Sequence, residues 1–261
     1  MEAKKINKFK MSVIILFIAL FVGIIAMTVS ISNTDDRWLQ IYSKATGFDK
    51  KQSIASSEDK REMYEVDEDG NEVKLLESSL MYTEWDLGSS DKYIFIRIIP
   101  DTMLEKDDPE YSYTEENWKN GTLVTTEYEG GNKTEGTPEQ ISLEEYFYNS
   151  GMFDYFNKID FTVKDNFSKL KITGYPRHLN ATIKNEKLDE TIGGVYETIG
   201  GASTMMKNVS VDIQLDSNYN IKFQKVEFND PDDKTLKTVL TTNIDQSSTK
   251  YSESLSTASI V

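Results

Sequence analysis

Hydrophobic residues gather most densely near the start of the chain. The 21 residues from Met11 to Ile31 include no charged side chain. As a helix they would reach roughly 30 Å, at about 1.5 Å of rise per residue, which matches the hydrocarbon core of a bilayer. Four lysines precede this stretch and two aspartates, Asp35 and Asp36, follow it, an arrangement that puts the N-terminus in the cytoplasm. The pattern predicts one transmembrane helix over residues 11–32, with the membrane as a partner and the rest of the chain outside.

A cleaved signal peptide is the competing interpretation of the same stretch. Its densest apolar part, Val13 to Met27, has 15 residues, at the upper end for a secretory signal, and Ser30-Ile31-Ser32 has the small-x-small form of a cleavage site. The length of the apolar run favours a retained anchor. We therefore expect a single-pass protein of the cell membrane, or a secreted protein if the segment is removed.

Beyond the anchor, alternation of apolar and polar residues predicts a mainly antiparallel sheet. The segment REMYEVDEDGNEVKLLES alternates on both sides of Asp69-Gly70-Asn71, which is a strong hairpin signal because glycine accepts positive φ. In the C-terminal part of the chain, the same alternation predicts a three-strand meander. The expected strands are 79–87, 92–99, 122–128, 159–163, 170–175, 209–215, 221–228 and 236–244. The acidic, turn-rich residues 100–120 are predicted to form a long loop.

One helical insert interrupts the strand pattern. Ser142-Leu-Glu-Glu145 has the form of a capping box, which predicts that a helix starts there. Five aromatic side chains lie in and after this helix, and they are expected to cover the sheet as core. If the sheet is strongly curved, the same rings would line an apolar cavity instead. These candidate ligand-binding residues are Tyr146, Phe147, Phe153, Tyr155 and Phe156.

Together these elements predict an α+β fold. It consists of an N-terminal transmembrane helix followed by a mainly antiparallel, curved sheet with a few covering helices. The expected organisation is a cytoplasmic basic tail at 1–10, the anchor at 11–32, a polar lead-in at 33–62, an extracytoplasmic α+β domain at 63–245 and a disordered polar tail at 246–261.

Composition narrows the functions open to this domain. The chain has no cysteine, which excludes disulfides, thiolate metal sites, cysteine nucleophiles and lipid attachment at a lipobox. After residue 32 there are 25 basic and 43 acidic residues, a formal charge of −18. Such a surface repels phosphate backbones, so nucleic acid is not an expected partner. Solubility explains the acidic balance most simply, and cationic partners are the ones it would attract.

Residue patterns for catalysis or metal binding are weak. His178 is the only histidine, and no G-x-S-x-G pattern accompanies it. The acidic clusters at 67–71 and 230–233 do not match an EF-hand and are better interpreted as turns. The glycine pairs at 193–194 and 200–201 lack the lysine of a phosphate loop. We therefore predict no catalytic residue, no metal and no cofactor, although two carboxylates alone could suffice for a glycosidase.

The order of elements resembles a known architecture over roughly residues 75–244. Strands, a helical insert at 142–157, further strands, a glycine-bearing segment and the meander NVSVDIQLDSNYNIKFQKVEF follow one another. This order is similar to that of the half-barrel bacterial envelope carriers of the LolA and LppX kind. The resemblance implies a curved antiparallel sheet with covering helices that enclose lipid or another apolar ligand. It assigns no binding residue, and the missing lipobox cysteine departs from the lipoprotein members.

Three functional hypotheses follow. The first is a membrane-anchored, extracytoplasmic, non-enzymatic binding protein that carries a lipid-like or other apolar ligand. The second is an adhesion or complex-assembly domain that presents an acidic face to an envelope protein. The third is a hydrolase that uses a pair of carboxylates, for which the sequence singles out no pair.

Overall fold

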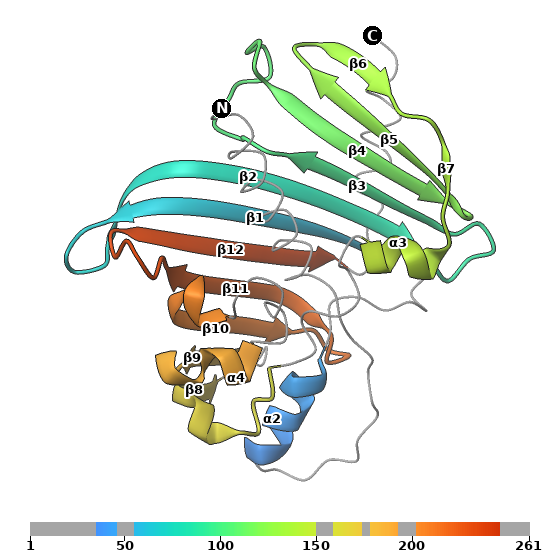
Figure 1. The fold of residues 1–261 in the computed structure, drawn as a ribbon. Helices are drawn as coiled ribbons and strands as arrows, with labels where there is room; N and C mark the ends of the chain where they lie inside the picture. Colours follow the sequence, from blue (N-terminus) through green and yellow to red (C-terminus); the bar gives the residue numbers. More distant parts are fainter. Residues whose placement is uncertain (1–34, 46–54, 150–158, 174–177, 193–201, 246–261) are drawn as a thin grey trace.

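The computed structural model describes residues 35–45, 55–149, 159–173, 178–192 and 202–245. Strands hold 55% of this part of the chain and helices 15%. All strands belong to one antiparallel sheet, which is open and curved (Figure 1). The strands are β1 (Ala55–Val66), β2 (Glu72–Asp86), β3 (Tyr93–Ile99), β4 (Ser112–Lys119), β5 (Thr122–Glu129), β6 (Asn132–Glu135), β7 (Glu139–Gln140), β8 (Phe167–Thr173), β9 (His178–Ile183), β10 (Lys207–Leu215), β11 (Ile221–Asn229) and β12 (Leu236–Asp245).

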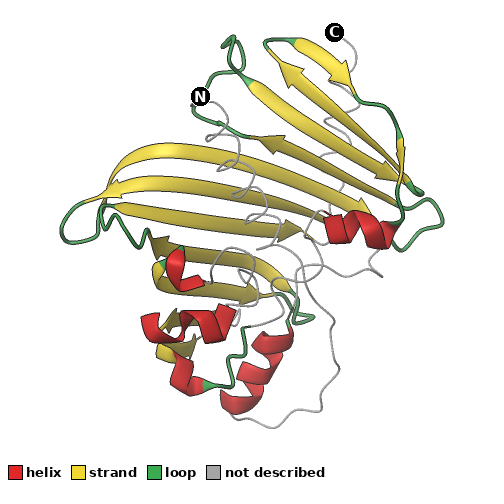
Figure 2. Ribbon diagram, viewed as in Figure 1, coloured by secondary structure: helices red, strands yellow, loops and turns green. Residues whose placement is uncertain are grey.

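The described helices are few and short, as Figure 2 shows. The α-helices are α2 (Asp35–Lys44), α3 (Leu143–Asn149) and α4 (Leu188–Ile192), and the 3₁₀ turns are Lys164–Asn166, Asn185–Lys187 and Ala202–Thr204. The α3 helix begins where the capping box predicts, because the Ser142 Oγ accepts the backbone N–H of Glu145 at 3.2 Å.

Pairing of β1 with β12 joins two meanders into one sheet. The strand order is β6-β5-β4-β3-β2-β1-β12-β11-β10-β9-β8, and β7 pairs with β5. In the β1–β12 ladder, Ser56 lies opposite Asp245 and Glu65 lies opposite Leu236. The first and last long strands of the chain therefore form the centre of the sheet, and strands from the two halves diverge on either side of it (Figure 1).

One face of the sheet carries the helices and two separate hydrophobic clusters. We call it the helix-bearing face, and the opposite face the outer face. The C-terminal cluster packs α2 and α4 against β8 to β12, with Leu179, Val211 and Leu240 among its most buried members. The N-terminal cluster packs α3 against β1 to β4, around Ile94 and Ile96. The two clusters lie on the same face because side chains two residues apart in a strand point the same way.

The predicted α+β class is wrong, since the described chain is mainly β. Two physical features account for the extra strand content. Both faces of β1 and β4 carry polar residues, so neither strand shows the apolar alternation that marks a half-buried strand. The alternation pattern therefore predicts a loop where β4 lies, and it places Ala55 to Glu62 in the polar lead-in. The helix predicted from the capping box is present as α3, which has seven residues.

No helix in the described ranges is both long and apolar enough to cross a bilayer. The longest of them, α2, has ten residues and contains two aspartates. The segment predicted to span the membrane, residues 11–32, lies outside the part of the chain that the structure describes.

Other predictions from the alternation pattern have mixed outcomes. The hairpin at Asp69–Asn71 is confirmed, because β1 ends at Val66, β2 starts at Glu72, and Gly70 has φ of +82°. The C-terminal meander is confirmed as β10, β11 and β12. The strand predicted at 159–163 is wrong, since this segment forms turns that lead into a 3₁₀ turn.

Candidate functional site

Buried polar side chains lie on the helix-bearing face where β2, β1 and β12 run side by side. We call this group the polar strip, and its members are Ser57, Asp59 and Arg61 of β1, Thr83 of β2 and Thr242 of β12. Their exposed fractions are all 7% or less. The register sets Ser57 opposite Thr83 and Asp59 opposite Thr242, so the strip is continuous across three strands.

The strip separates the two hydrophobic clusters. Ala55, two residues before Ser57, belongs to the N-terminal cluster. Leu240, two residues before Thr242, belongs to the C-terminal cluster. Ile244 packs against both clusters at one end of the strip. The helix-bearing face thus presents an apolar region, a polar band and a second apolar region in succession.

Asp59 is the most buried member of the strip and is incompletely satisfied. Its exposed fraction is 0%. The Ser57 Oγ donates to Asp59 Oδ2 at 3.0 Å, and Thr242 contributes a further side-chain hydrogen bond. Among the residues that the structure describes, Oδ1 has no hydrogen-bond partner. Burial raises the pKa of the Asp59 carboxyl well above its usual range, although the bonds from Ser57 and Thr242 oppose this.

Arg61, two residues along on the same face, does not supply the missing partner. Its Nη1 lies 3.1 Å from Glu77 Oε2 on β2. The Arg61 side chain is 8% exposed and that of Glu77 is 50% exposed, so this pair reaches from the strip to the surface. No ion pair to Asp59 is found within the described ranges. The Arg61 guanidinium is therefore paired with Glu77.

A second carboxyl, that of the partly buried Glu116, lies beside the N-terminal cluster. Burial raises the pKa of Glu116 on β4, and a hydrogen bond from Tyr146 partly offsets this effect. The Tyr146 hydroxyl donates to Glu116 Oε2 at 2.8 Å. The Tyr146 ring also stacks on Trp118, with ring centroids 6.5 Å apart, and Trp118 Nε1 donates to the Ile141 carbonyl at 2.9 Å. These contacts fix α3 on the sheet.

The structure locates two of the five predicted ligand-binding residues. Tyr146 is 2% exposed and packs in the N-terminal cluster. Phe147 lies in α3, and its side chain is outside the description. Phe153, Tyr155 and Phe156 fall outside the described residues. A cavity lined by these rings remains a prediction.

Sequence reasoning missed the polar strip. The segment ASSEDKREMYEV is polar at nearly every position, so its alternation does not reveal which side chains face inward. Only the pairing of β1 with β12, whose partners are more than 170 residues apart in the chain, shows that Asp59 lies beside Thr242. The one available signal was a pair of charged residues at successive inward positions, Asp59 and Arg61, and recognising it required the register to be known.

The single histidine lies on the outer face, away from the strip. His178 Nε2 contacts Asp212 Oδ1 across β9 and β10. The nearby Ser210 Oγ is directed to Glu227, at 3.4 Å. His178 and Asp212 therefore form a pair, whereas Ser210 contacts Glu227 instead. The His178–Asp212 pair is explained as a cross-strand contact.

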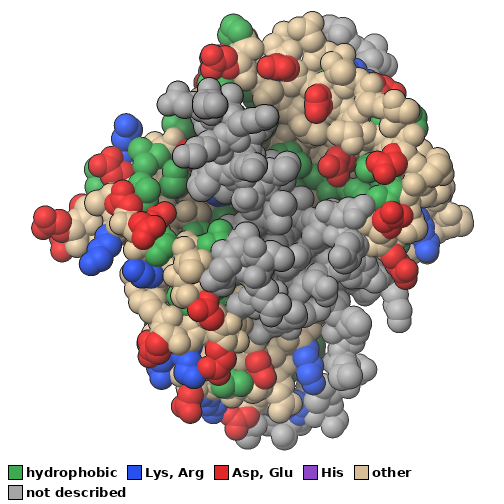
Figure 3. All heavy atoms as spheres, in the orientation of Figure 1, with side chains coloured by type: hydrophobic (Ala, Val, Ile, Leu, Met, Phe, Trp, Pro, Cys, Tyr) green, Lys and Arg blue, Asp and Glu red, His purple; other side chains and the backbone are tan. Residues whose placement is uncertain are grey.

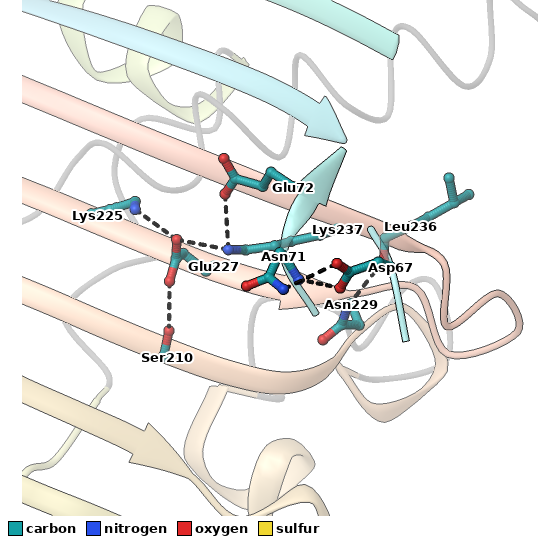
Figure 4. Close-up of polar contacts among 9 residues, drawn as sticks. All are labelled: Asp67, Asn71, Glu72, Ser210, Lys225, Glu227, Asn229, Leu236 and Lys237. Carbon is teal, nitrogen blue, oxygen red and sulfur yellow. Dashed lines mark hydrogen bonds and ion pairs between the residues drawn. The ribbon is translucent and has the colours of Figure 1, made fainter. Parts of the chain in front are cut away.

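The acidic turns use their carboxylates to close their own backbone. Asp67 accepts the backbone N–H groups of Asp69 and Asn71 at 3.0 and 2.8 Å, and the Asn71 side chain at 3.0 Å (Figure 4). Asp230 accepts the backbone N–H groups of its own turn in the same way. Within the described ranges no group of three acidic or histidine side chains is placed to hold a metal ion.

Charged side chains are dispersed over the visible surface. Figure 3 shows red carboxylates scattered over the face in view, with hydrophobic side chains toward its middle. On the outer face several carboxylates are paired with lysines, as in the group of Lys225, Glu227, Lys237 and Glu72 (Figure 4). The face in view thus shows no single acidic patch among the described residues.

No protein-family model matches this chain, and neither does any curated protein sequence.

Proposed function

We propose that this protein is a non-enzymatic binding protein that holds an amphiphilic, lipid-like ligand on the helix-bearing face of its curved sheet. The observation that carries the proposal is the polar strip between two hydrophobic clusters on that face. The localisation of this activity outside the cytoplasm is part of the proposal and follows from the sequence pattern of residues 1–32.

The polar strip makes the fold less stable than apolar residues at the same buried positions would. Burying a polar group without a full set of hydrogen bonds costs roughly 1–3 kcal/mol as judged from mutational data. Asp59 has one unpartnered oxygen within the described chain, at the centre of a long sheet where an aliphatic residue would fit the neighbouring Met81 and Leu240. Retaining a carboxylate here is explained if a ligand uses it.

The helix-bearing face combines a polar strip with apolar clusters, and an amphiphile combines a polar head group with an apolar chain. The polar strip would receive the head group, and either hydrophobic cluster would extend along the acyl or alkyl chain. Ligand sites in general combine apolar lining with a few convergent polar groups that fix orientation. A purely apolar ligand would leave the strip unsatisfied, so an amphiphile fits better than a hydrocarbon.

The hydrolase alternative gains no support from the described residues. The buried Asp59 and the partly buried Glu116 are the carboxyls described above on the helix-bearing face, and they lie three strands apart. At an interstrand spacing of about 4.8 Å, their backbones are roughly 14 Å apart. The two carboxyls of a glycosidase lie about 5 to 9.5 Å apart. The adhesion alternative likewise lacks a specific observation, because the acidic side chains are dispersed on the face that Figure 3 shows.

Extraction of the purified full-length chain tests the proposal. Mass spectrometry of an organic extract should detect an amphiphile in near-stoichiometric amount. The matched variants are Thr242→Val in the strip and Thr241→Val, the next residue on the same strand, which points to the outer face. We expect Thr242→Val to reduce the retained amphiphile several-fold and Thr241→Val to leave it unchanged. If the wild-type chain retains no amphiphile and binds none added to it, the proposal is wrong.

A further inference from the structure

Asp59 is the one strip residue with a polar atom left over. Its Oδ2 is held by Ser57 at 3.0 Å, and its carboxyl also bonds to Thr242. Its Oδ1 is buried and lacks a hydrogen-bond partner within the described chain. The bonds from Ser57 and Thr242 fix the carboxyl plane, so Oδ1 is presented in one orientation on the helix-bearing face. An acceptor fixed in this way discriminates strongly between ligands that can donate to it and ligands that cannot.

The charge around Asp59 points to the kind of donor. On the same face, the residues paired with Asp59 are Met81 of β2 and Thr242 of β12, and both are neutral. Arg61 is committed to Glu77 at 3.1 Å. The nearest other acidic group along the strand, Glu58, faces the opposite side and adds to the negative potential. A buried carboxylate without a cation is strongly disfavoured, so a positively charged group would gain most at this position.

A metal ion fits this position poorly. Hard cations such as Ca²⁺ require six to eight oxygen ligands, several of them carboxylates. Asp59 is the only carboxylate of the polar strip, and the described chain contains no cluster of three acidic or histidine side chains. An ammonium group needs only a few acceptors, and the hydroxyls of Ser57 and Thr242 lie beside the carboxyl.

We infer that Asp59 is the head-group receptor of this protein and that it selects amphiphiles with a positively charged amine. This inference rests on the proposed function and specifies the ligand class for the same face. The ammonium donates to Asp59 Oδ1, Ser57 and Thr242 hold the opposite oxygen, and the alkyl chain lies along the adjoining hydrophobic cluster. An anionic head group would face an unneutralised carboxylate and is rejected.

Three probes of equal chain length test the inference with the full-length protein. They are dodecylammonium, dodecanol and dodecanoate, and their dissociation constants are measured by calorimetry at an ionic strength that screens surface charge. We expect dodecylammonium to bind at least about tenfold more tightly than dodecanol, the factor expected for a charge-assisted hydrogen bond, and dodecanoate to bind most weakly.

Two variants separate the strip from the acidic surface. Asp59→Asn should abolish the preference for the ammonium probe over dodecanol, because the amide keeps the shape but not the charge. Glu58→Gln removes one negative charge from the next residue, on the opposite face, and should retain the preference. Equal binding of dodecylammonium and dodecanol by the wild-type chain would overturn the inference. This measurement does not depend on whether any variant folds. Persistence of the preference in Asp59→Asn would also overturn it.

The outcomes distinguish this inference from the proposed function. If dodecanol and dodecanoate bind as well as dodecylammonium, the protein holds amphiphiles without amine selection, and only the inference about Asp59 is wrong. If none of the three probes binds, the proposed function itself is wrong and the inference falls with it.

Discussion

Tyr146 of α3 and Glu116 of β4 are joined by a hydrogen bond of 2.8 Å across the interface between helix and sheet. Tyr146 is buried and Glu116 is partly buried, and desolvation raises the pKa of each. For Tyr146, the nearby Glu116 charge raises the pKa further, whereas for Glu116 the bond from Tyr146 has the opposite effect. The bond therefore links the position of a short helix to the charge state of one carboxyl on the helix-bearing face.

Replacing Tyr146 with Phe tests this link. The ring would still stack on Trp118, but Glu116 would lose its only described hydrogen-bond donor. We expect Tyr146→Phe to lower the free energy of unfolding by roughly 1–3 kcal/mol, the cost of an unsatisfied buried acceptor. The pKa of Glu116 should rise further in the variant. Urea unfolding gives the free energy, and Tyr219→Phe, at a ring that is 38% exposed, is the matched control with an expected change near zero.

Local signals explain why parts of the fold were predictable from the sequence. Asp69-Gly70-Asn71 identifies a hairpin because only a few residues tolerate positive φ, and Ser142 with Glu145 identifies the start of α3 because an N-cap satisfies free N–H groups. The meander at β10 to β12 is predictable because its apolar residues alternate strictly. Each signal is contained within about ten residues.

Features that depend on distant pairing were not predictable. β4 carries polar side chains on both faces, so no period marks it as a strand. The polar strip exists because Asp59 pairs with Thr242, at the opposite end of the chain. Nothing near either residue in the sequence indicates that they will be neighbours.

Gly70 provides a test of the hairpin that needs no knowledge of function. Its φ of +82° is unfavourable for a residue with a Cβ, although a Cβ there would meet no atom within 4 Å. The cost of Gly70→Ala should therefore arise from the backbone alone, about 1–2 kcal/mol. Gly70→Asn should cost less, because asparagine tolerates this region better than alanine. Thermal or urea unfolding measures both, and equal loss in the two variants would contradict a backbone origin.

Lys237 is expected to stabilise the outer face in a pH-dependent way. Its Nζ lies 3.0 Å from Glu72 Oε1 and 3.1 Å from Glu227 Oε1 (Figure 4). Burial by itself would raise the pKa of Glu227, but the bonds from Lys225 and Lys237 outweigh it and hold that pKa below its usual value. A lowered pKa in the folded state means that this stabilisation is present above the ordinary glutamate value, about 4.3, and is lost as the pH falls below it.

We therefore predict that Lys237→Met lowers the free energy of unfolding by about 1 kcal/mol at pH 7. The difference from wild type should be smaller at pH 3, because Glu227 takes up a proton as the pH falls through its lowered pKa. Lys234→Met, at an exposed lysine of the β11–β12 turn, is the matched control and should change stability little at either pH. A loss that is equal at pH 7 and pH 3 would show that Lys237 acts through packing of its aliphatic stem.

Asp59 should have the opposite dependence on pH. Burial raises its pKa in the folded state, whereas in the unfolded chain the value is close to the ordinary one, about 3.9. Between these two values the folded protein binds more protons than the unfolded chain, so the contribution of Asp59 to stability falls as the pH rises through that window. The contribution is most favourable below the ordinary aspartate pKa.

Asp59→Asn should therefore stabilise the protein at neutral pH, by about 1 kcal/mol or more, because a neutral amide replaces a buried group that tends to ionise. Urea unfolding from pH 4 to pH 7 should show the gain growing with pH, and Glu58→Gln, one residue away on the opposite face, should show a smaller gain. A loss of stability at pH 7 would mean that Asp59 is retained for folding. A gain in stability together with a loss of amine binding would mean that the chain tolerates an unstable carboxyl because a ligand requires it, as expected where a binding site is built at the expense of the core.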